Sequence, residues 1–304
     1  MIIALINAKD EHETETLIKV AGALAPSIIN SRNENGQTAL MMAKNSYQTF
    51  FLIKAGANIY DRSHYGCTAL MFAKTAEQTA FLIKSAEDSS ANSEASGVKA
   101  ACAAYVNAVN CNGYSALMFA NTSSQTKILI EANADIYAET KDGSTVLMYA
   151  KTAEQTKLIL ESAGASAAGA AGAAAGSTSS YVNHQNKFGF TALICAKNAD
   201  QTDLLLKIPG IDVNIKTDNG DTALMRSKSV KQTELLIKAG AKINDTNNFG
   251  FNALMYAISH GQTILLLKAG ADITVKNNYG YSALTEAITA EQKNILRNAM
   301  VLNI

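Results

Sequence analysis

The sequence predicts an all-α solenoid of short helix-turn-helix repeats, and three recurring patterns carry this prediction. A glycine, one variable residue, a small polar residue, a small aliphatic residue and a leucine occur in this order eight times. A helix-capping pattern then precedes a second apolar stretch, and that stretch often ends in Ala-Gly-Ala. The eight copies begin at Gly36, Gly66, Gly113, Gly143, Gly189, Gly220, Gly250 and Gly280, at spacings of 30, 47, 30, 46, 31, 30 and 30 residues. A fixed period in this range is typical of solenoids.

The first apolar stretch of each copy predicts a first helix of about two turns. In the first copy it runs from Ala39 to Ala43 and follows Thr38, a suitable residue for the start of a helix. Ala39 and Ala43 are four residues apart, on one helix face, where small side chains allow close packing.

The second helix of each copy is predicted by a capping box. In this motif the first side chain accepts from the N–H of the third helical residue, and the glutamine reaches back to the N–H of the cap itself. Glycines such as Gly56, Gly240 and Gly270 then supply a left-handed stop. The eight pairs are Asn45-Gln48, Thr75-Gln78, Thr122-Gln125, Thr152-Gln155, Asn198-Gln201, Ser229-Gln232, Ser259-Gln262 and Thr289-Gln292.

These features resemble ankyrin repeats. The segments Gly270-Ala271-Asp272-Ile273 and Gly280-Tyr281-Ser282-Ala283-Leu284 match that consensus most openly. The resemblance covers nearly the whole chain apart from two inserts. It implies an ankyrin repeat solenoid of helix-turn-helix units with hairpin-like finger loops.

The chain departs from the family pattern in two ways. Its period is about three residues shorter than the usual 33 or so. The Thr-Pro-Leu-His of the family is replaced by Thr-Ala-Leu-Met, so the histidine hydrogen bonds that tie neighbouring repeats in the family have no counterpart at this position. We expect the methionines to form a stacked core column that fills the histidine's space. They are Met41, Met71, Met118, Met148, Met225 and Met255.

We predict a single ankyrin repeat domain over residues 1–304. Residues 1–30 form an N-terminal capping repeat in which Leu5 aligns with Leu40, and eight repeats over 31–304 follow, the last one acting as a C-terminal cap. In that last copy Thr285 replaces the methionine, as a polar terminal repeat requires.

Two loop inserts account for the longer spacings. They cover about 87–104 and 166–180 and precede the strand-like segments 105–107 and 181–183. The second insert is low in complexity and is expected to be flexible. The inserts are interpreted either as solvated insertions without function or as adaptable binding loops.

Composition excludes several classes of function. The charges cancel, 26 − 26 = 0, and no basic stripe stands out, so we expect no nucleic acid partner. No apolar run reaches the length of a membrane span, and the first residues do not resemble a secretory signal. A soluble, cytoplasmic protein is therefore expected, with export as the alternative if an upstream signal was trimmed.

No catalytic, metal-binding or cofactor-binding residues are expected, and the protein is predicted not to be an enzyme. The histidines occupy unrelated repeat positions, and the cysteines form no zinc or disulfide framework. A Cys102–Cys111 pair stays open for an exported protein. The residues are His12, His64, His184 and His260, with Cys67, Cys102, Cys111 and Cys195.

Aromatic residues mark the candidate partner-binding positions. Rows of exposed rings are typical of interfaces, whereas the competing interpretation is that the rings pack on each other and on the first helices. One set flanks the finger glycines: Tyr65, Tyr114, Phe188, Phe190, Phe249, Phe251, Tyr279 and Tyr281. A second set follows the methionine column by one residue: Phe72, Phe119, Tyr149 and Tyr256.

The resemblance implies a non-enzymatic scaffold that binds a partner protein through its concave face and finger tips, and we expect it to be a monomer. The alternative is an exported, periplasmic or secreted protein with a structural or protective role beside a neighbouring enzyme. An enzyme hidden in the inserts is the weakest hypothesis, because neither insert gathers His, Asp, Glu or Cys.

Overall fold

The computed structural model describes residues 5, 8–22, 28–90, 95–169 and 178–302. These residues form 17 helices joined by turns, with isolated β-bridges and no strands, which confirms the all-α solenoid. They group into two compact units, 1–141 and 142–304, and the single domain over 1–304 stays a prediction. Unit 1 contains α2 (Glu11–Ala21), α4 (Ala39–Met42), α5 (Ser46–Lys54), α6 (Ala69–Phe72), α7 (Ala76–Ser90), α8 (Ala95–Val106), α9 (Ala116–Phe119) and α10 (Ser123–Glu131). Unit 2 contains α11 (Val146–Tyr149), α12 (Ala153–Gly169), α13 (Thr178–Val182), α14 (Ala192–Cys195), α15 (Ala199–Leu206), α16 (Val230–Lys238), α17 (His260–Lys268), α18 (Ala283–Glu286) and α19 (Ala290–Leu302).

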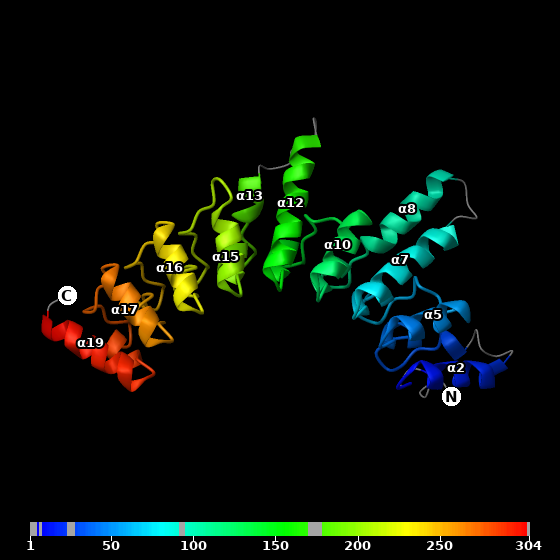
Figure 1. Cartoon of the computed structure of the whole chain (residues 1–304), viewed down its shortest axis with the longest axis horizontal. Coiled ribbons are helices and arrows are strands. Elements are labelled where there is room, and N and C mark those ends of the chain that lie inside the picture. The colour runs from blue at the N-terminus through cyan, green and yellow to red at the C-terminus, as the bar shows by residue number, and fades with distance from the viewer. Residues whose placement is uncertain (1–4, 6–7, 23–27, 91–94, 170–177, 303–304) are drawn as a thin grey trace. The chain divides into compact units, whose positions relative to one another are not determined.

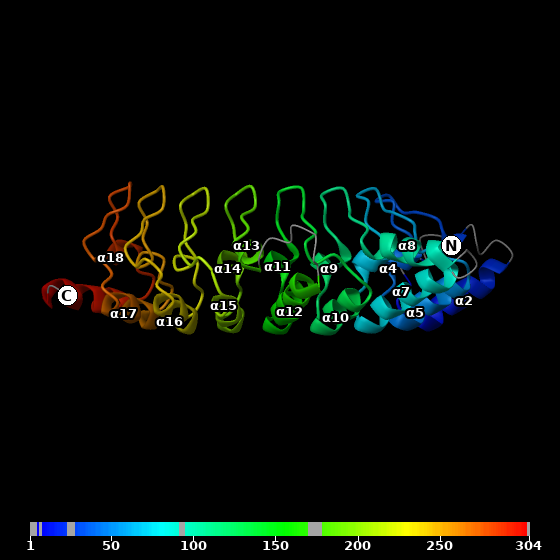
Figure 2. The same ribbon diagram turned by 90° about the horizontal axis from the view of Figure 1, so that it is seen from above.

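Within each unit the second helices of successive repeats lie side by side. In unit 1, α5 packs on α7 and α7 on α10 (Figure 1). In unit 2 the order α12, α15, α16, α17, α19 follows the chain (Figure 1). The finger loops of unit 2 extend together on the side away from these helices (Figure 2).

The first helices are shorter than the two turns predicted from the sequence. Helix α4 has 4 residues, because Ala43 adopts an extended conformation and its N–H bonds back to the carbonyl of Leu40. The hydroxyl of Thr38 makes no cap bond and is buried without a partner, whereas Thr191 does accept from the N–H of Ile194. In two repeats of unit 2 the same stretch forms only turns.

Two hydrogen bonds were predicted for the cap of each second helix. The structure confirms the first and corrects the second. In every copy the cap side chain accepts from the glutamine N–H, as in Asn45 with Gln48 at 2.9 Å. The glutamine Oε1, however, accepts from the residue before the cap, as in Lys44 with Gln48 at 2.7 Å. At Thr152 and Thr289 the reciprocal bond to the cap N–H forms in addition.

The same glutamines connect each repeat to the one before it. The Nε2 of Gln232 donates to the carbonyl of Ala196 and to the hydroxyl of Thr202, the latter at 2.9 Å. Thr202 follows the glutamine of its own repeat and donates its hydroxyl to the carbonyl of its helix cap, Asn198. We call this the glutamine–threonine ladder. It joins Gln48, Gln78, Gln125, Gln201, Gln232, Gln262 and Gln292 to Thr14, Thr49, Thr79, Thr156, Thr202, Thr233 and Thr263 respectively.

Every partner in this ladder is buried. Gln232 is 3 % exposed and Thr202 1 %. A buried amide that makes its hydrogen bonds fixes the position of its neighbours, because leaving it unpaired is costly. The ladder thus takes the place of the histidine bonds that the chain lacks.

The apolar core follows the predicted columns. The repeat leucines of the first seven copies and the six methionines of the predicted column are buried, so that column is confirmed. Leu147 and Met148 are 4 % and 7 % exposed. In the last copy Thr285 takes the methionine position and is exposed.

The left-handed stops after the second helices are confirmed, and an asparagine of the preceding repeat holds each one. Gly240 has a φ of 88°, and Asn214 donates from Nδ2 to its carbonyl and accepts from the N–H of Lys242. Asn133 takes the glycine's place with a φ of 61°, and its carbonyl accepts from Nδ2 of Asn107 in the same pattern.

The predictions for the inserts need correction. Residues 105–107 and 181–183 are not strand-like, because Tyr105 and Tyr181 lie near the ends of α8 and α13. Helix α7 continues to Ser90 and α12 to Gly169, so both inserts extend a second helix. Most of the second insert, residues 170–177, lies outside the described residues. Before the first insert Tyr60 replaces the holding asparagine, and its ring contacts Tyr105 at 5.5 Å between centroids.

The ladder predicts a large loss of stability for Gln232→Leu. The change removes one acceptor and two donors and leaves buried polar groups in two repeats unpaired. We expect the free energy of unfolding to fall by at least about 3 kcal/mol in urea denaturation. Gln185→Leu is the control, because Gln185 donates two hydrogen bonds at an exposed position, and it is expected to cost about 1 kcal/mol or less. Equal losses for the two variants would contradict a special role of the ladder.

Candidate partner-binding surface

Five of the finger loops are organised by an asparagine three residues before the finger glycine, and Ser63, Thr140 and Thr217 take this position in the others. The Oδ1 of Asn247 accepts from the N–H groups of Phe249 and Phe251 at 3.0 and 2.9 Å. The backbones of Asn247 and Phe251 also bond, and the N–H of Gly250 donates to the carbonyl of Asn247. Gly250 has a φ of 78°, a conformation that favours glycine. The two rings therefore leave the loop from fixed backbone positions.

Successive fingers within a unit are joined by a backbone hydrogen bond. In unit 2 the N–H of Asp218 donates to the carbonyl of Phe188 at 3.0 Å, and that of Asn278 to the carbonyl of Phe249 at 2.9 Å. The fingers approach so closely that a Cβ on Gly189 would lie 2.7 Å from the nitrogen of Asp218. This spacing explains the finger glycines and keeps the loops stacked.

The candidate finger rings fall into two groups by exposure. The rings before the glycine are exposed, with Phe188 at 55 %, Phe249 at 43 % and Tyr279 at 64 %, and Tyr65 is exposed as well. The rings after the glycine, Tyr114, Phe190 and Phe251, are half-buried, while Tyr281 is 53 % exposed. In the second set Phe72, Phe119 and Tyr149 are half-buried, and Tyr256 lies at the border of exposure.

The half-buried rings pack on one another. Tyr114 lies 5.6 Å from Phe119, and Phe251 lies 5.4 Å from Tyr256, between ring centroids. Phe251 also meets Tyr279 of the next finger edge-on at 6.4 Å. Packing thus accounts for this group, and the binding role of all the rings stays a prediction.

A polar network that was not predicted from the sequence connects the rings of unit 2. The guanidinium of Arg226 lies 5.4 Å from the ring of Phe190 and pairs with Asp221 at 3.2 Å. Asp221 is buried and accepts from Nδ2 of Asn247 at 2.8 Å. The same Nδ2 lies 3.1 Å from the hydroxyl of Tyr256. Burial, and then the charge of Asp221, raise the pKa of Tyr256, so its hydroxyl stays protonated at neutral pH.

Rings and network together form one surface over four consecutive repeats of unit 2. We call it the ring surface. Its members are Phe188, Phe190, Asp221, Arg226, Asn247, Phe249, Phe251, Tyr256, Tyr279 and Tyr281. The variable position directly after the finger glycine holds Phe190, Asp221, Phe251 and Tyr281. Alignment of the repeats would therefore have placed Asp221 among the ring positions.

A second feature of unit 2 was also missed. The residue directly before the cap of each second helix donates its N–H to the glutamine Oε1, so these residues occupy equivalent backbone positions. We call them the inter-helix row. They are Lys151, Lys197, Lys228, Ile258 and Ile288. Alignment of the repeats alone would have revealed the lysines, which are dispersed in the linear sequence.

Unit 1 carries an aromatic patch on its second helices that no sequence pattern suggested. Phe50 meets both Phe51 and Phe81 edge-on at 5.5 Å. With Tyr47 and Glu77 they line a hollow of about 560 Å³. The position of Phe50 holds a lysine, aspartate or glutamate in four other repeats, so comparison of register positions would have identified it.

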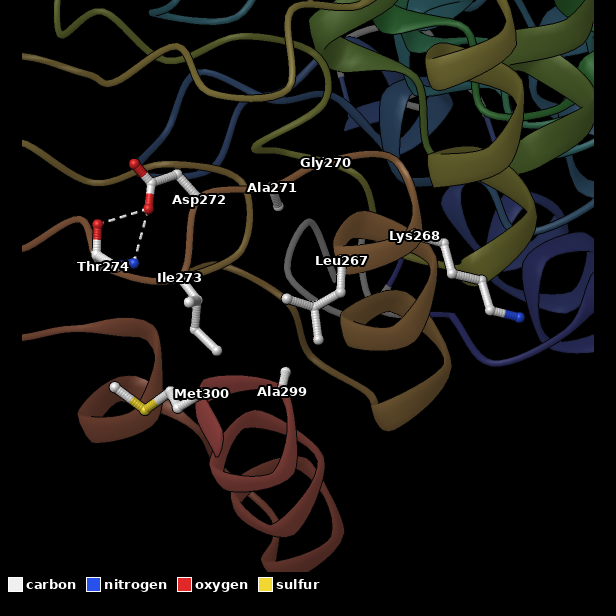
Figure 3. Close-up of a pocket in the computed structure, with 9 residues that line it drawn as sticks. All are labelled: Leu267, Lys268, Gly270, Ala271, Asp272, Ile273, Thr274, Ala299 and Met300. Carbon is white, nitrogen blue, oxygen red and sulfur yellow. Dashed lines mark hydrogen bonds between the residues drawn. The ribbon is translucent and has the colours of Figure 1, made fainter. Parts of the chain in front are cut away.

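A hollow of about 510 Å³ in unit 2 lies between the end of α17, the turn after it and α19 (Figure 3). Leu267, Ile273 and Ala299 face its interior, and Lys268 points away (Figure 3). The N–H and hydroxyl of Thr274 both donate to Asp272 (Figure 3). These bonds lower the pKa of Asp272, which serves the turn as an ionised acceptor.

The remaining chemistry-bearing side chains have structural surroundings. All four cysteines are free thiols, so Cys102 and Cys111 are not paired. His184 bonds the carbonyl of Gly143 at 2.9 Å. Within the described ranges no three His, Cys, Asp or Glu residues gather as a metal site. None of the helices described combines the length and apolarity that a membrane span needs.

Helix-turn-helix units, left-handed stops and stacked finger loops define a repeat solenoid that presents rings from its loops. Comparison with protein families agrees: residues 226–298 match the model for ankyrin repeats (3 copies). The match supports the resemblance to ankyrin repeats that the sequence predicts. A comparison with functionally curated proteins finds no match.

The network predicts that Asn247→Ala destabilises the ring surface. The substitution removes the acceptor of two loop N–H groups and the partner of the buried Asp221 carboxylate. We expect a loss of about 2–4 kcal/mol in the free energy of unfolding. Its neighbour Asn248 is exposed and donates one bond to Asp218, so Asn248→Ala is the control and should cost less than about 1 kcal/mol. Similar losses for both would contradict the network.

Proposed function

We propose that the chain is a non-enzymatic scaffold that binds a partner protein through the ring surface of unit 2. Ankyrin repeats are generally protein–protein interaction modules and typically non-enzymatic. The proposal goes further by assigning the contact to named finger tips and to the first helical turns beside them.

One observation carries the proposal: Phe188, Phe249, Tyr279 and Tyr281 are exposed although the loops that hold them are fixed. Aromatic side chains on a rigid frame lose little conformational entropy on binding and bury a large area. Exposed large rings contribute less to stability than buried ones, because about half of their area stays in water in the free protein. Four such rings near one another are therefore best explained as contact residues.

The half-buried rings support this role because they hold exposed rings in place. Phe251 contacts Tyr279 and itself packs on Tyr256, and Arg226 covers Phe190 and is itself held by Asp221. The exposed rings are thus preorganised, which lowers the cost of binding.

The alternative is an exported protein with a structural or protective role beside an enzyme. A partner enzyme would still need a contact surface, so the ring surface serves both hypotheses. They differ in the identity of the captured partner, and the same experiment separates them.

The experiment is affinity capture with the full chain, followed by mass spectrometry and a titration of the captured protein. We expect Phe249→Ala combined with Tyr279→Ala to weaken its binding by more than about 100-fold, since each ring supplies about 2 kcal/mol as an interface hot spot. Far-ultraviolet circular dichroism should remain that of the wild type, because both rings are exposed.

The matched control is Tyr47→Ala combined with Phe50→Ala. It also removes two exposed rings, but from the second helices of unit 1. A partner that binds the finger variant as tightly as the wild type, or that is lost only with the control variant, would refute the assignment.

A further inference from the structure

Most lysines of the second helices form ion pairs with acidic neighbours on the same helix. Lys207 contacts Asp203 at 2.6 Å, and Lys238 contacts Glu234 at the same distance. Such pairs, three or four residues apart, recur in both units. They are Lys19–Glu15, Lys84–Asp88, Lys127–Glu131, Lys157–Glu161, Lys207–Asp203, Lys231–Glu234 and Lys238–Glu234.

The inter-helix row differs from this arrangement. Lys197 and Lys228 are exposed, and neither forms an ion pair with any described acidic residue. Both donate a backbone N–H to a ladder glutamine, at 2.9 and 2.8 Å. The ladder therefore fixes the two cations at equivalent positions of adjacent repeats.

The charges of this row act on each other and on the ring surface. Burial lowers the pKa of Lys151, and the charge of Lys197 lowers it further. Burial raises the pKa of the Cys195 thiol, while the charges of Lys197, Lys228 and Arg226 oppose that change. Arg226 belongs to the ring surface, so the cations and the rings lie within electrostatic reach of one another. Clustered like charges destabilise the free protein, and an anionic partner would relieve this repulsion.

Further along the chain the row becomes apolar. Ile258 is 51 % exposed and Ile288 71 %. They occupy the same backbone position as the lysines and belong to the repeats that carry Phe249, Phe251, Tyr279 and Tyr281. Unit 2 thus presents a positive end and an apolar end along one row.

We propose that the partner segment bound by unit 2 is an acidic peptide whose carboxylates lie along Lys197 and Lys228 and whose apolar side chains contact Ile258, Ile288 and the exposed rings. The proposal rests on the proposed function and adds the chemistry of the partner. On the second helices of unit 2, Lys207, Lys231 and Lys238 are paired with acidic residues, whereas the two lysines of the inter-helix row in adjacent repeats are not. A nucleic acid is less suited, because the positive row is short, ends in isoleucines and belongs to a chain of zero net charge.

The test is a selection from a phage-displayed library of random peptides on the immobilised full chain. Synthetic, fluorescein-labelled copies of the selected peptides are then titrated by fluorescence anisotropy. We expect the selected peptides to be net negative and to contain large apolar residues. Lys197→Glu combined with Lys228→Glu should weaken their binding by at least about tenfold and reduce its dependence on salt.

The control is Lys242→Glu combined with Lys268→Glu. It makes the same change in net charge at two exposed lysines of unit 2 outside the row, and binding should stay within about twofold of the wild type. Circular dichroism of both variants verifies that the fold is intact.

The outcomes separate the two proposals. Neutral or basic peptides that still require Phe249 and Tyr279 would overturn the acidic partner and leave the proposed function standing. Peptides indifferent to those two rings would overturn the proposed function. Equal weakening by the row variant and the control, or no enriched peptide, would also overturn the acidic partner. Binding of an oligo-dT strand that the row variant abolishes would assign the row to nucleic acid instead.

Discussion

A buried glutamine that bonds both its own repeat and the preceding one is the interaction on which the rest of this structure depends. Its Oε1 accepts from the residue before the cap, and its Nε2 donates to a carbonyl and a threonine hydroxyl one repeat earlier. Every polar atom of the amide is used. Since these atoms are removed from water, a shift of one repeat against the next would leave several of them unpaired. The ladder therefore fixes the register of the stack.

The geometry of the surface follows from this register. Repeats fixed at their second helices bring the finger loops close enough for a backbone bond such as Asn278 to Phe249. The same closeness excludes any side chain at Gly189. Rings before the finger glycines are then left exposed, while Tyr114 and Phe251 after them pack on rings of the first helical stretch. The ladder also sets the positions of Lys197 and Lys228, because it bonds their backbones directly.

Local patterns in the sequence predicted the elements well, whereas contacts between repeats could not be predicted from them. The capping pairs and the glycine stops depend on neighbours a few residues away, so they were visible. The donors of Gln232 reach Thr202, 30 residues earlier, and only the threonine that follows most of the glutamines hinted at a shared role. The first helix was predicted too long because helix propensity continues to Ala43, where the short repeat turns the chain.

The same limit applies to the candidate surface. The aromatic positions around the finger glycines were found from the sequence, but their division into exposed and packed rings needed coordinates. The connected side chains Asp221 and Arg226 come from one repeat, and Asn247 comes from the finger of the next repeat. No local motif therefore contains all three. The inserts were predicted as loops before strand-like segments, whereas both begin as continuations of second helices and the alanine-rich end of the first lies in α8. The substitution of Tyr60 for the holding asparagine was a signal for this in the preceding repeat.

The most direct measurement of the ladder is a double-mutant cycle between Gln262 and Thr233, which belong to adjacent repeats. The Nε2 of Gln262 donates to the hydroxyl of Thr233 at 3.0 Å. The free energy of unfolding would be measured for Gln262→Leu, Thr233→Val and the double variant. If the ladder ties the repeats, the losses are strongly non-additive, with a coupling of at least about 1 kcal/mol. Losses that add within about 0.3–0.5 kcal/mol would show that the two residues act independently and would contradict the account.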